Sequence, residues 1–308
     1  DHGWTYMHDQ GRQDIEIELG FKTTYIENVP ENADAVRAIR KLASSGHDLI
    51  FTTSFNYMDQ TLEVAKEFPD VKFEHATGYK RTDNVATYSS RFYEGRTIAG
   101  HIAGKESKTG VVGYIASFPI PEVVRGINAF YLAASKVNPD IKLKIIWAYT
   151  WYDPGKEADA AQTLINQGAD IIVQHTDTYA PCQVAQKNGV KAFGQASNQY
   201  DFCPDAHLTA IIDEWGPYYV ERAKALADGT WESTDTWKGL ESGMVEMAPY
   251  RNMHPDTKFE AIALQKGLTK GEIHSFEGPI YNQAGELMVP EGEVAPDGML
   301  LGMNWYVK

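Results

Sequence analysis

The chain contains an internal near-repeat, whose two copies begin at Gly46 and Gly168. In each copy a short apolar run leads into a loop of polar and aromatic residues, a helical stretch and a second apolar run. An amphipathic helical segment precedes each copy, at residues 33–42 and 158–165. Short apolar strands that alternate with helices are typical of parallel sheets built from βαβ units. The repeat therefore predicts an α/β protein with two similar lobes.

This organisation also predicts where a ligand would bind. Strands are expected at residues 46–51, 71–73, 111–115, 142–149, 168–173 and 190–193. Ligands of open parallel sheets bind beyond the carboxyl ends of the strands. The loops expected there combine aromatic or amide side chains with hydroxyls, and they span residues 54–57, 117–119, 149–153, 176–179 and 195–199. Such loops suit a flat ligand with polar edges, because rings stack on its faces and amides bind its edge.

Length and charge narrow the class of protein further. At 308 residues the chain is long for one hydrophobic core, which favours two domains of about 150 residues each. The net charge of −14 argues against a nucleic-acid partner, because neutralising phosphates requires a basic surface. No run approaches the ~18 apolar residues of a membrane span. The last third of the chain is weakly patterned, and we expect strands and loops there that return across the lobes.

The sequence lacks the usual signatures of catalysis. It contains no G-x-S-x-G elbow, phosphate-binding Walker loop, G-x-G-x-x-G or H-E-x-x-H motif. None of the nine histidines has a His or Cys three or four residues further on, so we expect no metal site, no cofactor and no enzymatic activity. Carboxylates near the expected site are best interpreted as helix caps or hydrogen-bond acceptors. The alternative is a nucleoside or glycoside hydrolase that uses Asp153 or Asp177.

The two cysteines, Cys182 and Cys203, have no C-x-x-C partner, which argues against a zinc or redox motif. They form either a disulfide, in an oxidising compartment, or two buried thiols.

Four segments of the chain resemble the basic membrane protein family. They are GWTYMHDQGR from Gly3, FTTSFNYMDQTLEVAKEFPDVKFEHATG from Phe51, DNVATYSSRFYEGRTIAGHIAGKESKTGVVGYIASFPIPEVVRGINAF from Asp83, and VNPDIKLKIIWAYTWYDPGKEADAAQTLINQGADIIVQHTD from Val137. The family comprises substrate-binding proteins of ABC importers, among them purine-nucleoside receptor lipoproteins. The resemblance extends through about Gln199 and is looser beyond it.

The resemblance implies a type I periplasmic binding protein, with two Rossmann-like lobes that contain parallel sheets and are joined by hinge crossovers. The N-terminal lobe would comprise residues 1–117 and about 243–280, and the C-terminal lobe residues 118–242 and about 281–308. A purine would bind in an aromatic cleft between the lobes, which hinge motion closes. It also implies an exported monomer, in the periplasm or on the outer face of the cytoplasmic membrane, that serves an ABC permease.

Export would place Cys182 and Cys203 in a disulfide. We further expect the first strand of the N-terminal lobe to precede residue 1. A lipid anchor upstream of residue 1 is one of the alternatives that the resemblance leaves open. The stretch from Asp1 to Tyr6 would then be a ligand loop, and the first helix would begin near Met7.

The family resemblance and the loop positions together predict a set of binding residues. In the family, the acidic residue of the opening motif recognises the purine base. This acid corresponds to Asp1 here, and the aromatic residue of the same motif corresponds to Trp4. The predicted ligand-binding residues are Asp1, Trp4, Thr5, Phe55, Asn56, Tyr88, Phe118, Trp151, Asp177, Tyr179, Gln195, Ser197, Gln199 and Trp215.

Two departures from the family pattern bear on the ligand. Nucleoside-binding relatives read Gly-Val-Asp-Ser-Asp-Gln where this chain has residues 194–199, so Ala196 replaces the acid that holds the ribose hydroxyls. A lysine that also contacts ribose is replaced within residues 208–213. A site without these partners loses preference for the sugar, and Trp215 is placed to fill the vacated volume. We therefore expect a free purine base such as adenine, with a purine nucleoside, a sugar or another small polar metabolite as alternatives, and a sensor role as the alternative to import.

Overall fold

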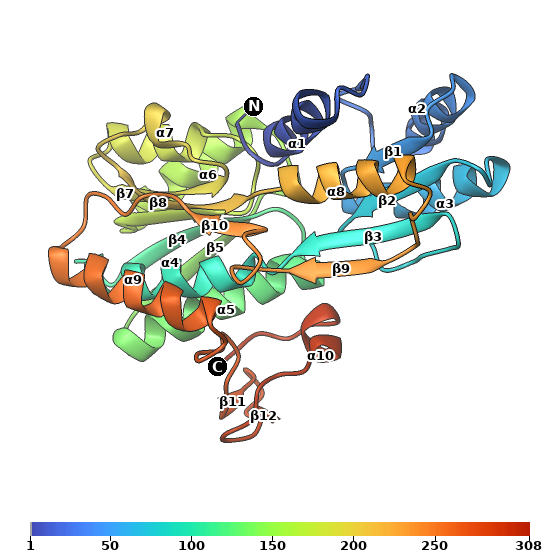
Figure 1. The fold of residues 1–308 in the computed structure, drawn as a ribbon. Helices are drawn as coiled ribbons and strands as arrows, with labels where there is room; N and C mark the ends of the chain where they lie inside the picture. The colour runs from blue at the N-terminus through green and yellow to red at the C-terminus, as the bar shows by residue number, and fades with distance from the viewer. Residues whose placement is uncertain (1) are drawn as a thin grey trace. The chain divides into compact units, whose positions relative to one another are not determined.

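The computed structural model describes residues 2–308, and its chain forms two compact units (Figure 1). Unit 1 comprises Asp1–Met7, Arg91–Asp213 and Gly239–Lys308, and unit 2 comprises His8–Ser90 and Glu214–Lys238. The chain therefore passes between the units four times, and each unit contains its own sheet.

The sheet of unit 1 has six strands, and all neighbouring strands except the β10–β8 pair are parallel. In spatial order they are β10 (Val245–Met247), β8 (His207–Asp213), β7 (Lys191–Ala196), β6 (Ile171–Gln174), β4 (Val111–Ala116) and β5 (Lys142–Trp147). The central strands are apolar on both faces because helices cover both sides of the sheet, as parallel sheets require.

The helices of unit 1 divide between the two faces of this sheet. They are α4 (Tyr93–Glu106), α5 (Pro121–Val137), α6 (Pro154–Asn166), α7 (Ala180–Lys187), α9 (Pro255–Thr269) and the short α10 (Asp297–Leu301). Near the C-terminus a two-stranded hairpin, β11 (Ile280–Tyr281) with β12 (Leu287–Val289), stands apart from the main sheet.

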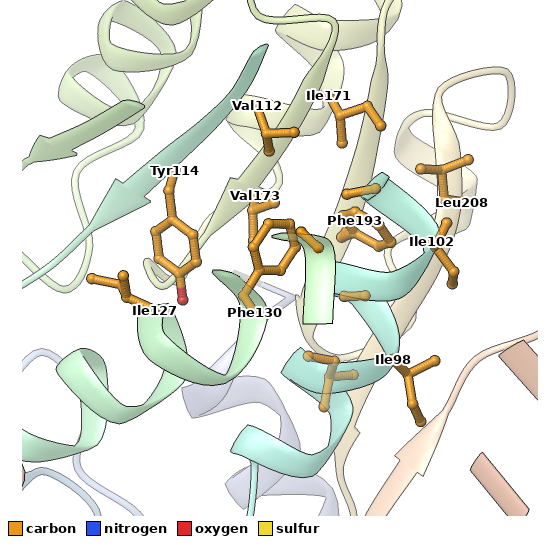
Figure 2. Packing of buried hydrophobic residues seen from close by; sticks show 14 of the residues in the cluster. Ile98, Ile102, Val112, Tyr114, Ile127, Phe130, Ile171, Val173, Phe193 and Leu208 are labelled. Carbon is orange, nitrogen blue, oxygen red and sulfur yellow. The ribbon is translucent and has the colours of Figure 1, made fainter. Parts of the chain in front are cut away.

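Successive side chains of a strand point to opposite faces of the sheet. Alternate residues of the unit 1 strands therefore pack into two separate hydrophobic cores, one on each face. Val112 and Tyr114 of β4 pack with α4 and α5, whereas Ile115 packs with α6 and α7. Figure 2 shows the first core, in which Phe130 of α5 contacts both Tyr114 and Phe193 edge to face, at 5.9 and 6.3 Å between ring centroids.

Unit 2 is built around a smaller, fully parallel sheet. Its order is β1 (Leu49–Thr52), β2 (Lys72–Ala76), β3 (Val85–Ser90) and β9 (Asp235–Lys238). Helices α2 (Ala33–Ser44) and α3 (Met58–Glu67) pack on one face through an aliphatic core. Helix α8 (Gly216–Ala227) lies against the other face, where Tyr219 stacks on Phe51 with 3.9 Å between ring centroids.

The α/β architecture with two mostly parallel sheets expected from the sequence is confirmed, and so is the near-repeat. Each copy forms a strand, a loop, a helix and a strand, as β1–α3–β2 in unit 2 and β6–α7–β7 in unit 1. For the last third of the chain we expected strands and loops. Strands β9 and β10 form there, but so do the helices α8 and α9, which were not expected. Helix α9 gives a weak sequence signal because Phe259 and Ile262 are exposed rather than buried.

The passages between the units differ from the lobe boundaries expected near residues 117 and 242. Residues 91–117 belong to unit 1, with the passage at residues 90–91. The reason is pairing and packing, since β4 is hydrogen-bonded between β5 and β6, and α4 packs along α5. The 281–308 segment also belongs to unit 1, together with 243–280.

Helix α1 (Trp4–Leu19) begins three residues before Met7, the start expected from the sequence. Trp4 and Thr5 therefore lie in the first turn of a helix and not in a loop. The cap of this helix comes from Asp177, whose carboxylate accepts a hydrogen bond from the Trp4 backbone N–H. A cap contributed by a residue 173 positions away leaves no local signal.

Candidate functional site

Four of the predicted ligand loops lie at one edge of the unit 1 sheet. Strands β7, β6, β4 and β5 are consecutive neighbours and run parallel, so the segments that follow them share an edge. The segments are 195–199, 176–179, 117–119 and 149–153, although Gln195 and Ala196 still belong to β7. The fifth loop, 54–57, follows β1 in unit 2 and contains a 3-10 turn at Phe55–Tyr57.

Aromatic rings from two of these segments meet in unit 1 beside His175, the residue that directly follows β6. The ring of Phe118 lies 5.2 Å from that of Trp151, and Trp151 lies 6.2 Å from His175. Phe92, which precedes α4, lies 5.9 Å from the same histidine. Phe92 and His175 are buried, whereas Phe118 and Trp151 are half-buried, so the last two rings are the ones that a ligand at this edge of the sheet could contact.

Tyr179 occupies a second aromatic group in unit 1. It stacks face to face on Phe202, with ring centroids 3.9 Å apart and planes 4° apart. The His2 ring lies 4.8 Å from Phe202. One face of Tyr179 is therefore covered by the protein, which the sequence did not indicate. Nearby, Cys182 at the start of α7 forms a disulfide with Cys203.

Asp177 is buried and engaged with the start of α1. Besides the Trp4 backbone, the hydroxyl of Thr5 donates to its Oδ2 at 3.4 Å. Burial raises the pKa of Asp177 to about 7, against the opposing effect of the hydrogen bond from Trp4. Gly3 permits this close approach, because a Cβ there would overlap the Asp177 carboxylate.

Ser197 and Gln199 both bind the N-terminal segment. The Ser197 hydroxyl and Gln199 Nε2 donate to the backbone carbonyl of His2, the latter at 3.3 Å. Gln199 Oε1 accepts from Gln174 Nε2 and from the Gln195 backbone, each at 3.4 Å. These two side chains therefore fix residues 2–5 against the ends of β6 and β7.

In unit 2, Tyr88 and Trp215 belong to a buried aromatic network. The Tyr88 hydroxyl lies 2.7 Å from that of Tyr219, which in turn lies 2.7 Å from His8 Nδ1. Trp215 is fully buried and stacks on His8, with ring centroids 4.9 Å apart. Burial lowers the pKa of His8 to about 3, so the imidazole is neutral near pH 7.

Phe55 and Asn56 lie elsewhere in unit 2. Asn56 is exposed and donates to Glu31 at 2.6 Å, and the Phe55 ring lies 6.4 Å from that of Tyr79. Asp1 lies outside the described residues. The other predicted residues thus form separate groups in the two units, and their role as ligand contacts stays a prediction.

Several buried or half-buried polar groups lie beside the unit 1 rings, and Arg96, Glu122 and His175 among them were not predicted from the sequence. Arg96 of α4 is fully buried, and His175 lies 3.5 Å from Glu122. Burial lowers the pKa of His175, which favours its neutral form. The Oγ of Ser117 and the Nε1 of Trp151 are buried and have no hydrogen-bond partner in the part of the chain that is described. The signal available in the sequence was the position of His175 directly beyond β6.

The arrangement suits recognition of a small molecule through stacking and hydrogen bonds. Across residues 2–308, no group of three or more His, Cys, Asp or Glu side chains is placed to hold a metal ion. Within the same range, every helix is too short or too polar to cross a bilayer.

Fold and site together define a class, the type I periplasmic binding proteins. The structure of a solute-binding protein of an ABC transporter system from Aeropyrum pernix aligns with a TM-score of 0.77. The alignment covers 88% of each chain at 18% sequence identity, and at this identity it shows only that the two chains share a fold.

The chain belongs to the Bmp family of PnrA-like ABC transporter substrate-binding proteins, whose model matches residues 1–277. It is 57% identical to a purine-binding protein of Brucella abortus, over the whole of this chain and 88% of that one. It is also 34% identical to a putative ABC transporter glucose-binding protein of Haloferax volcanii, over 91% of this chain and 72% of that one. Members of the family are extracytoplasmic proteins that bind a small molecule for a permease.

Proposed function

We propose that this chain binds a purine for an ABC importer, with the free base adenine as its ligand. The purine-binding relative at 57% identity supports the ligand class. The half-buried rings of Phe118 and Trp151 at the edge of the sheet support a planar ligand, since aromatic faces stack on purines.

The observation that favours the base over the nucleoside is Ala196. Family members that bind nucleosides have an acid there, and a methyl group cannot accept hydrogen bonds from a ribose diol. The neighbouring polar side chains do not replace that acid, because Ser197 and Gln199 donate to His2. Asn198 is exposed, and its Oδ1 accepts from the Tyr200 backbone at 3.2 Å.

Titration calorimetry with adenine, adenosine, guanine and guanosine tests the proposal. Adenine is expected to bind more tightly than adenosine, and the reverse order would contradict the proposal. Glucose belongs in the same panel, because the 34% identical relative carries a glucose-binding name. Glucose binding without purine binding would make this a sugar receptor.

An Ala196→Asp variant sharpens the test. Ala196 has a φ of 62°, in the left-handed region that Asp and Asn tolerate better than most residues. A carboxylate there is expected to raise the affinity for adenosine relative to adenine. Ala196→Asn is the matched control, since it has similar size and backbone tolerance but no charge. Equal effects of the two substitutions would contradict a specific role for the acid.

The proposal is binding without catalysis. Asp153 Oδ1 accepts the Lys156 backbone N–H at 3.0 Å as the N-cap of α6, and Asp177 caps α1. Carboxylates used in this way are poor candidates for a hydrolytic pair. Incubation with adenosine, followed by chromatography for the free base, is expected to show no turnover. Release of adenine over many cycles would contradict this part of the proposal.

A further inference from the structure

The side-chain amide of Gln195 has an orientation imposed by Arg96. Arg96 Nη2 donates at 2.6 Å to Gln195 Oε1 and at 2.7 Å to the backbone carbonyl of Gln174. A guanidinium has donors and no acceptor, so only the oxygen of the amide can face it. This chemistry settles which end of the amide is oxygen.

The consequence is that the Gln195 NH₂ group points away from Arg96. Nε2 makes no hydrogen bond with any of residues 2–308, although the residue as a whole is 4% exposed. Gln195 lies at the carboxyl end of β7, next to Ala196, where ligands of parallel sheets bind. An amide that cannot rotate offers N–H donors and no acceptor at this place.

Arg96 is itself buried between aromatic rings, and Nη2 is the guanidinium nitrogen that donates hydrogen bonds to described residues. It extends from α4 and is fully buried, with its guanidinium carbon 5.0 Å from the centre of the Phe92 ring and 5.3 Å from that of Tyr114. Its two bonds from Nη2 connect the ends of β6 and β7. A rotation of the Gln195 amide would place NH₂ against this buried cation, which is strongly unfavourable.

We infer that Arg96 is a positioning residue that makes Gln195 a hydrogen-bond donor to the ligand, so that the site selects a purine with an unprotonated ring nitrogen at that point. The inference rests on the proposed function. Gln195 is the contacting residue, and Arg96 acts through it. A purely structural clamp between β6 and β7 would affect stability and leave ligand selectivity unchanged.

Deaza analogues test this directly, because each replaces one acceptor nitrogen of adenine by C–H. Affinities for adenine and for 1-deaza-, 3-deaza- and 7-deazaadenine are measured by calorimetry on the full chain. Wild type is expected to bind one analogue about tenfold more weakly than adenine, the effect of one lost hydrogen bond. In Gln195→Met the penalty for that analogue is expected to disappear, because methionine makes no such bond.

Substitutions of Arg96 separate positioning from structure. Arg96→Met leaves the amide free to rotate and is expected to reduce the same penalty. Arg96→Lys retains a cationic donor facing Oε1 and is expected to keep it. The matched control is Arg125→Lys, another buried arginine of unit 1, whose Nη1 donates to the Leu300 carbonyl at 2.8 Å. This variant is expected to lose stability and keep the wild-type selectivity.

The outcomes distinguish the two proposals. If wild type binds adenine but discriminates against none of the analogues, or if the penalty persists in Gln195→Met, the inference is overturned and the proposed function stands. If wild type binds neither adenine nor the analogues, both are overturned. Should Arg96→Met fail to fold, Gln195→Met and Arg96→Lys still decide the question.

Discussion

At the scale of single residues, Glu74 of unit 2 shows how a buried charge is accommodated. Its side chain is completely buried and forms an ion pair with Arg222. Tyr218 donates to its Oε2 at 2.6 Å, and Trp231 Nε1 donates to its Oε1 at 2.7 Å. The carboxylate is therefore surrounded by donors, and a buried charge is stable only when it is paired in this way.

Glu74→Gln is expected to lower the free energy of unfolding by about 3 kcal/mol, since it leaves Arg222 buried without a counter-charge. Urea unfolding monitored by circular dichroism measures the change. Glu67→Gln is the control, because Glu67 pairs with Arg40 at the exposed surface of the same unit and its loss should have little effect. If both substitutions lowered the free energy of unfolding equally, the stabilising role of the buried Glu74–Arg222 pair would be contradicted.

Asp177 gives a pH dependence of known sign. The pKa of Asp177, about 7 in the folded state, exceeds the ordinary aspartate value of 3.8, so between these two pH values the folded protein binds more protons than the unfolded chain does. The contribution of protonated Asp177 to the free energy of unfolding is therefore complete below about pH 4, and it is lost as the pH rises to about 7. Asp177→Asn should remove this contribution, because the amide accepts from Trp4 without titrating.

The measurement is the free energy of unfolding of wild type and Asp177→Asn from pH 4 to pH 8.5. The wild type is expected to lose stability relative to the variant by up to about 1.4 kcal/mol per pH unit inside this window, with a constant difference above it. Groups that titrate in both proteins cancel in the comparison. Parallel curves throughout would show that burial does not raise this pKa.

At the scale of secondary-structure elements, α4 and α5 approach closely through glycine. A Cβ at Gly100 would overlap the carbonyl oxygen of Phe130, and one at Gly104 would lie 2.7 Å from that of Ala134. Backbone atoms cannot move aside as a flexible side chain would. These glycines therefore allow the α4–α5 packing that assigns residues 91–117 to unit 1.

Gly100→Ala is expected to lower the free energy of unfolding by about 2 kcal/mol, despite the better helix propensity of alanine. Gly298→Ala is the matched control in α10, since no atom lies within 4 Å of the added methyl group. It should leave stability unchanged or raise it by up to ~1 kcal/mol. Thermal and urea unfolding of both variants measure the contrast, and a stable Gly100→Ala protein would contradict the packing argument.

At the scale of the whole molecule, a ligand that binds the native chain and not the unfolded one must stabilise it. Adenine at a hundred times its Kd is expected to raise the free energy of unfolding by about 2.7 kcal/mol. Thermal unfolding with increasing adenine measures the shift, and adenosine at equal concentration should raise Tm less. A larger shift with adenosine would contradict the preference for the free base.

The sequence by itself determined the class of fold and the position of most elements. The strands at 111–116, 171–174 and 191–196 and helix α2 follow from local periodicity, because apolar residues at strand or helix spacing must face a core. The near-repeat then implied two similar lobes. The same reasoning placed five expected ligand loops beyond the carboxyl ends of strands, where ligands of parallel sheets bind. The structure added that four of them follow neighbouring strands of one sheet.

Only the tertiary structure decided which partners those elements meet. The start of α1 depends on Asp177, and the orientation of the Gln195 amide depends on Arg96, 99 residues away. The passage between units at residues 90–91 depends on β4 pairing with β5 and β6. The spacing of apolar residues in the sequence indicates which face of a helix or strand is buried. It does not indicate which distant donor or strand lies against that face, because tertiary packing determines that contact.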